Sequence, residues 1–117
     1  MLKIYGIKNC DTLKKTLKFF DQKGINYDFV DFKTTPPDCE LVRKWADALG
    51  IKKLFNTRST TYRNLKLKEM NLDDEAKIEW MCKEPLLIKR AVVEKDENII
   101  VGYDEKAFEK LIKGEQP

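Results

Sequence analysis

The stretch that decides the fold is LKIYGIKNCDTLKK, residues 2–15. The apolar run from Leu2 to Tyr5 predicts a buried strand, and the glycine after it permits a sharp exit. A helix is predicted to follow, because the next apolar residues recur at helical spacing, and Asn9 or Asp11 is expected to cap its start. Cys10 therefore falls at the beginning of a helix.

The position of Cys10 favours chemistry at its sulfur. A helix start has unpaired N–H groups and the positive end of the helix dipole, and both stabilise a thiolate. Lys8, Lys14 and Lys15 add positive charge nearby. The alternative interpretation is a small buried hydrophobe, since free cysteines are often packed in cores. Sequence position alone leaves both interpretations open.

The composition limits the function. The 117 residues fit one domain, and the 42% that are hydrophobic are enough to form a core. The net charge of +3 is weak and scattered, which argues against direct nucleic-acid binding. The sequence shows neither a membrane-length apolar run nor a signal peptide. We therefore expect a cytoplasmic monomer that does not contact membranes.

The reactive residue types narrow the mechanism further. Histidine is absent, which removes Cys–His and Ser–His pairs and most zinc or iron sites, so we expect no metal. Three widely spaced cysteines predict neither a disulfide framework nor a zinc site, and they fit a reducing compartment. Cys39 follows a possible helix cap and is the rival nucleophile to Cys10. Cys82 is expected to pack within an apolar helix.

The rest of the chain predicts an α/β fold. A second strand at residues 25–32 completes a parallel strand–helix–strand unit, which places Cys10 at the carboxyl edge of the sheet, where sites form. An antiparallel hairpin and a last helix capped by Asp104 end the chain. This order resembles a thioredoxin-like, four-stranded mixed sheet with a helical insertion. We expect a single domain with these parts: residues 1–35 and 86–114 as the core, and 36–85 as the insert.

The predicted insert contains two segments that are less regular. Residues 56–63 are polar and are predicted to form a loop, whereas residues 65–70 give an ambiguous pattern. Asp38 is a suitable cap for the helix before this region, and residues 71–74 are predicted to open the helix after it.

Three blocks carry a family likeness. Tyr5–Thr12, Leu54–Arg58 with Thr61–Arg63, and Pro85–Arg90 resemble, in this order, the blocks of the arsenate reductase/Spx family. The likeness covers nearly the whole chain and is greatest to a single-cysteine branch described as glutathione-dependent thiol reductases. It implies a thioredoxin-like fold with a helical insert.

The resemblance also implies a site. Cys10 becomes the nucleophile, and Arg58 and Arg90 become the pair that faces an anion. A guanidinium binds an oxyanion or a carboxylate through two hydrogen bonds and keeps its charge at cellular pH. The alternative for both arginines is solvated surface charge. Asn9 and Lys14 are expected to bind the anion together with backbone N–H groups of residues 11–14.

The expected substrate-binding residues are Asn9, Asp11, Thr12, Lys14, Arg58 and Arg90.

The sequence departs from the family at three points. Arg90-Ala91 stands where the family usually has Arg-Pro with a cis bond, and we expect a trans bond because cis bonds before residues other than proline are costly. Basic residues of the arsenate reductases are missing, which argues against arsenate as the natural substrate. Leu13 stands where the redox-switch branch has a second cysteine.

Two functions are therefore expected. In the first, the Cys10 thiolate attacks an oxyanion or an oxidised thiol, no cofactor is bound, and glutathione or a glutaredoxin resolves the adduct as co-substrate. In the second, the chain is an Spx-type regulator that binds RNA polymerase without catalysis.

Overall fold

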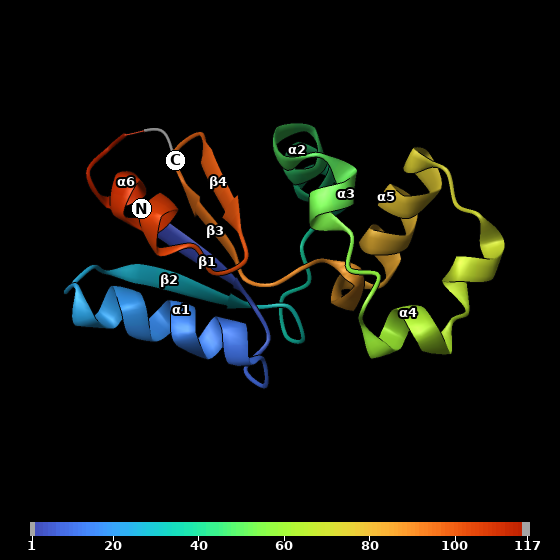
Figure 1. The fold of residues 1–117 in the computed structure, drawn as a ribbon, viewed down its shortest axis with the longest axis horizontal. Helices are drawn as coiled ribbons and strands as arrows, with labels where there is room; N and C mark the ends of the chain where they lie inside the picture. Colours follow the sequence, from blue (N-terminus) through green and yellow to red (C-terminus); the bar gives the residue numbers. More distant parts are fainter. Residues whose placement is uncertain (1, 116–117) are drawn as a thin grey trace. The chain divides into compact units, whose positions relative to one another are not determined.

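The computed structural model describes residues 2–115, and Met1, Gln116 and Pro117 of the expected domain lie outside the described residues (Figure 1). The elements in chain order are β1 (Leu2–Gly6), α1 (Asp11–Gln22), β2 (Tyr27–Asp31), α2 (Cys39–Leu49), α3 (Ile51–Leu54), α4 (Thr60–Asn64), the 3₁₀-helix η1 (Leu67–Met70), α5 (Asp74–Lys83), the 3₁₀-helix η2 (Pro85–Leu87), β3 (Val92–Lys95), β4 (Asn98–Val101) and α6 (Glu105–Ile112). Within this part of the chain, no helix is long and apolar enough to cross a membrane.

The four strands form one mixed sheet in the order β2-β1-β3-β4. β1 runs parallel to β2, with Ile4 opposite Phe29, and antiparallel to β3, with Ile4 opposite Val93. β3 and β4 form the antiparallel hairpin that the sequence predicts. The expected α/β class and the thioredoxin-like mixed sheet of four strands are confirmed.

The chain separates into two compact units. The first contains residues 1–35 and 90–117, and the second contains residues 36–89. We expected residues 86–89 to belong with the strands, but backbone hydrogen bonds connect them to the last residue of α3 and to the segment that follows it. The Asn56 N–H donates to the Leu87 carbonyl at 2.7 Å, and the Lys89 N–H donates to the Leu54 carbonyl at 2.8 Å.

The core of the first unit lies on one face of the sheet, beneath α1 and α6. Both helices and the strands contribute buried side chains to one cluster: Leu2, Ile4, Leu13, Phe19, Phe20, Ala91, Val93, Ile100, Phe108 and Leu111. The Phe108 ring centroid lies 5.3 Å from that of Phe19 and 5.1 Å from that of Phe20. This aromatic group joins the two helices over the sheet.

The second unit has buried side chains of its own. They come mainly from α2, α3, α5 and η2: Val42, Trp45, Ala46, Leu54, Ile78, Met81 and Leu87. Trp45 and Met81 are fully buried, and α2 packs against α5. The insert therefore has an interior independent of the sheet's helical face.

A disulfide joins Cys39 at the start of α2 to Cys82 near the end of α5. The expectation of three reduced cysteines is wrong for this pair, as are the roles of rival nucleophile for Cys39 and of packing residue for Cys82. The two residues are separated by 43 positions and become neighbours because α2 and α5 pack together. Residue spacing alone does not reveal that contact.

Asp38 and Asp104 cap helices as predicted. Their carboxylates accept backbone N–H groups in the first turns of α2 and α6, and Asp73 does the same in α5. The predicted loop over residues 56–63 is partly wrong, because residues 60–63 belong to α4. The Ser59 hydroxyl accepts the Tyr62 N–H at 3.1 Å and starts that helix, a signal that a polar composition hides.

Reduction of the Cys39–Cys82 disulfide is expected to lower the free energy of unfolding by about 2–4 kcal/mol, because the cross-link restricts the unfolded chain. Urea unfolding with and without reductant measures the loss, and Cys10→Ser, measured in parallel, excludes a contribution from the free thiol. A Cys39→Ser/Cys82→Ser variant should not respond to reductant. Equal stability in both conditions, or three alkylatable thiols in the unreduced unfolded protein, would contradict the cross-link.

Phe108→Ala is expected to lower the free energy of unfolding by about 3–5 kcal/mol, because its fully buried ring contacts Phe19 and Phe20. The matched control is Tyr103→Ala, which removes an exposed ring beside Phe108 and should cost less than about 1 kcal/mol. Thermal or urea unfolding followed by circular dichroism compares the two. Similar losses would place the stabilising contacts elsewhere.

Candidate functional site

The turn between β1 and α1 carries the candidate nucleophile. A Cβ atom added at Gly6 would lie 3.1 Å from Leu13 Cδ1, so glycine lets the first turn of α1 approach the end of β1 closely. The Gly6 carbonyl accepts the Phe32 N–H at 2.8 Å, which extends the β1–β2 pairing to this point. The Cys10 N–H donates to the Ile7 carbonyl at 3.2 Å and closes the turn.

Cys10 is the residue from which α1 starts. Its backbone is extended, with φ −99° and ψ 123°, and its carbonyl accepts the Lys14 N–H at 3.0 Å. The prediction that Asn9 or Asp11 caps this helix is therefore wrong. Cys10 is a free cysteine, half-buried, and it packs against the core cluster. Its side chain thus combines support from the core with partial access to solvent.

The first turn of α1 differs from those of the other long helices. Among the described helices of eight or more residues, α2, α5 and α6 each have a capping aspartate, whereas Cys10 makes no side-chain capping hydrogen bond to α1. N–H groups in the first turn of a helix have no partner within the helix. Together with the helix dipole, they provide a favourable environment for an anion.

The predicted anion-binding residues of this turn lie around Cys10 along the chain. Asn9, Asp11 and Lys14 are exposed, and Thr12 is half-buried. Asp11 contributes a negative charge to the first turn, so the side chains alone do not make it strongly cationic. The Thr12 carbonyl accepts the hydroxyl of the buried Thr16 at 2.8 Å, which holds the helix start in place.

Arg90 lies in the same unit as Cys10, at the end of the segment that leads into β3, and it is half-buried. The Arg90–Ala91 peptide bond is cis, so the predicted trans bond is wrong. The prediction used only the intrinsic preference of an isolated bond. In the fold, Ala91 is fully buried in the cluster that Cys10 contacts, and its carbonyl accepts the Gly102 N–H at 2.9 Å, so the surroundings determine the backbone.

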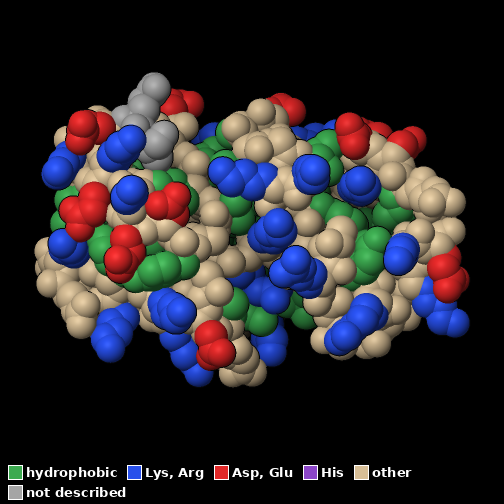
Figure 2. Space-filling view, viewed as in Figure 1, with side chains coloured by type: hydrophobic (Ala, Val, Ile, Leu, Met, Phe, Trp, Pro, Cys, Tyr) green, Lys and Arg blue, Asp and Glu red, His purple; other side chains and the backbone are tan. Residues whose placement is uncertain are grey.

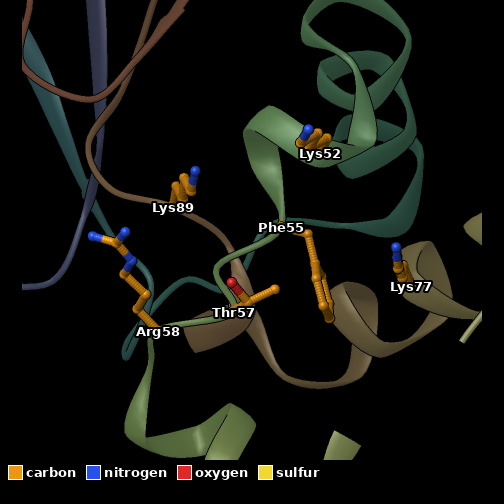
Figure 3. Close-up of a pocket in the computed structure, with 6 residues that line it drawn as sticks. All are labelled: Lys52, Phe55, Thr57, Arg58, Lys77 and Lys89. Carbon is orange, nitrogen blue, oxygen red and sulfur yellow. The ribbon is translucent and has the colours of Figure 1, made fainter. Parts of the chain in front are cut away.

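Arg58, the other predicted anion-binding arginine, belongs to the second unit, unlike Cys10. It is exposed and follows α3 in a turn where its N–H donates to the Asn56 side-chain oxygen at 3.1 Å. Arg58 lines a pocket of about 500 Å³ that lies entirely within this unit (Figure 3). The other lining residues are Lys52, Phe55, Thr57, Lys77 and Lys89.

Sequence reasoning missed the three lysines of this pocket. They come from α3, α5 and the segment before β3, so no spacing in the sequence connects them. The chain has many lysines, and a surface lysine gives no signal by itself. Only the packing of the insert brings these three together.

Comparisons with known proteins agree with the geometry. Residues 5–111 match a family model described as the ArsC family. A solved structure of the YFFB (PA3664) protein is 35% identical, with 93% of this chain and 96% of that chain covered and a TM-score of 0.87. A possible arsenate reductase from Streptococcus mutans is 32% identical, with 96% and 98% covered and a TM-score of 0.80.

Several curated relatives carry an enzyme name, arsenate reductase. The arsenate reductase of Neisseria meningitidis serogroup A is 25% identical over 104 residues, which are 86% of this chain and 89% of the relative. The sheet topology, the cysteine at the start of α1 and a family match over most of the chain lead to one assignment. The chain belongs to the ArsC family.

Proposed function

We propose that this protein is a thiol-dependent reductase in which Cys10 is the nucleophile. The observation that carries the proposal is a free, half-buried cysteine at the start of a helix whose first turn it does not cap. Thiolates are stabilised at such positions by N–H groups and the helix dipole. Membership of a family that includes a relative named arsenate reductase supports the same chemistry.

The substrate in this proposal is a mixed disulfide with glutathione or an oxyanion. With a mixed disulfide, the Cys10 thiolate attacks one sulfur, forms a new disulfide and releases the other partner as a thiolate. A glutathione thiolate then attacks the adduct, which regenerates Cys10 and leaves glutathione disulfide. With an oxyanion, the Cys10 sulfur bonds to the central atom and water is lost. Two glutathione thiols then form a disulfide and transfer two electrons to the central atom, the sulfur bond breaks, and the reduced oxyanion leaves with Cys10 regenerated.

An external thiol is required because no second cysteine is available close in sequence to Cys10. Among the described residues, Cys39 and Cys82 are joined to each other, and position 13 is leucine. Glutathione or a glutaredoxin therefore completes the cycle in this proposal. The N–H groups of residues 11–14, with Asn9 and Lys14, bind the negative charge of the substrate.

Arg90 and Arg58 have the supporting role of anion binding. Arg90 precedes Ala91, which is buried in the cluster that Cys10 contacts, and Arg58 lies in the cationic pocket of the insert. A guanidinium offers parallel N–H groups to an oxyanion or carboxylate, and an ammonium does not. Replacement of either arginine by lysine therefore keeps the positive charge but removes the parallel N–H groups.

Intact-protein mass spectrometry tests the nucleophile. After incubation with oxidised glutathione, and separately with arsenate plus glutathione, the protein is expected to gain one adduct at Cys10, and iodoacetamide should alkylate Cys10 at least about tenfold faster than an ordinary thiol near pH 7. Cys10→Ser should gain no adduct. Cys39→Ser/Cys82→Ser should still gain one at Cys10. Alkylation of Cys10 at the ordinary rate, with no adduct, would overturn the proposed activity.

Lysine substitution tests the arginines. Arg90→Lys and Arg58→Lys are each expected to lower kcat/KM for reduction of a glutathione mixed disulfide by roughly 10–100-fold, because two-point anion binding is lost. Arg63→Lys is the matched control, since Arg63 is exposed and belongs neither to the predicted substrate-binding residues nor to the lining of the pocket. It should change kcat/KM less than about twofold. An equal loss of kcat/KM at all three positions would show that the loss does not come from anion binding by Arg90 and Arg58.

A further inference from the structure

The pocket of the insert is lined by four cationic side chains and by no acidic one. Lys52 comes from α3, Lys77 from α5, Lys89 from the segment before β3, and Arg58 from the turn after α3. Phe55 and Thr57 complete the lining. Figure 2 shows basic side chains predominating on the face over α3. Four separate segments thus contribute cationic residues to the lining of one hollow, although the Arg58 guanidinium extends away from Lys52 and Lys77 (Figure 3).

These cations lack acidic partners within the described residues. Two ion pairs of the described residues, Lys23 with Glu109 and Arg43 with Glu75, involve no residue of the pocket. Lys77 is half-buried, and its ammonium lies 5.9 Å from the centroid of the Phe55 ring. Like charges collected in one concave site repel one another, and the low-dielectric walls strengthen that repulsion. A multiply charged anion would remove it.

The shape of the pocket also suits a small ligand. Its volume of about 500 Å³ lies within the usual range for ligand sites. Figure 3 shows the Phe55 ring between Thr57 and Lys77, while Lys52 and Lys89 extend from other segments. The buried ring forms an apolar wall, and the Thr57 hydroxyl provides a neutral donor beside the charged ones.

We propose that this pocket binds a small polyanion with two or more phosphate groups. Ammonium groups bind phosphate oxygens as point charges. Because the three lysines come from separate segments, one anionic group meets only some of them, and linked phosphates meet more. The pocket shares Arg58 with the proposed reductase function, but the inference goes beyond that function, since the three lysines lie in residues 36–89 and need no thiol.

Isothermal titration calorimetry with pyrophosphate and tripolyphosphate, on the oxidised full chain at low salt, tests the site. We expect one saturable site per chain, with orthophosphate at least about tenfold weaker than tripolyphosphate. Lys52→Gln, Lys77→Gln and Lys89→Gln should each weaken tripolyphosphate binding about 3–10-fold. Lys53→Gln is the matched control, because Lys53 is exposed on the same helix as Lys52 and does not line the pocket. It should change affinity less than about twofold.

Two further measurements make the result decisive. Cys10→Ser should bind tripolyphosphate as the wild type does, so failure of the reductase proposal and failure of this one are separate outcomes. Circular dichroism and thermal unfolding check that the lysine variants stay folded, and Lys52→Arg should keep most of the affinity because it keeps the charge. Absence of a saturable site, or equal weakening by Lys53→Gln and Lys52→Gln, would overturn the proposal.

Discussion

The close packing of Leu13 onto Gly6 is the contact on which the rest of the first unit depends. It places the first turn of α1 directly over the end of β1, so closely that a Cβ atom at position 6 would lie 3.1 Å from Leu13 Cδ1 and the leucine would have to shift to accommodate it. β1 is held on both sides, by β2 and β3, so its end is fixed in the sheet. The start of α1 is therefore held against the sheet, and Cys10 lies at this junction. A defined position of this kind favours a nucleophile, because the donors around it keep their orientation.

Much of the fold followed from local patterns in the sequence. The strand predicted at residues 2–5, the helix after Cys10 and the hairpin near the end each follow a clear hydrophobic pattern, and the structure shows all three, although no side chain caps the helix. Aspartate caps were as informative as hydrophobic patterns, since their hydrogen bonds depend on the next few residues only. The insert was harder to predict. Its short helices depend on packing with partners far along the chain, and residues 86–89 follow hydrogen bonds to Leu54 and Asn56 that no local signal shows.

The predicted site depends on local signals and on a resemblance. Cys10 was proposed from its place after a strand and before a helix, and the arginines from a family resemblance; their roles stay predictions. The Cys39–Cys82 bond, the cis bond before Ala91 and the three lysines of the pocket all depend on contacts between distant segments. Each of these features depends on packing between segments that lie far apart in the chain, and their spacing shows no pattern. A single sequence does not show contacts between distant segments. It therefore cannot distinguish a disulfide-bonded cysteine from a packed one, or a clustered lysine from a solvated one.

The independent interior of residues 36–89 has a consequence for how this architecture diversifies. Trp45 and Met81 are shielded within the insert, and its α2 and α5 are covalently joined, so its surface can accumulate substitutions without disturbing the strand–helix junction at Cys10. Selection can then alter which molecules the insert recruits while the sulfur chemistry is inherited unchanged. In such an arrangement, ligand preference and reactivity evolve as separable traits of one short polypeptide.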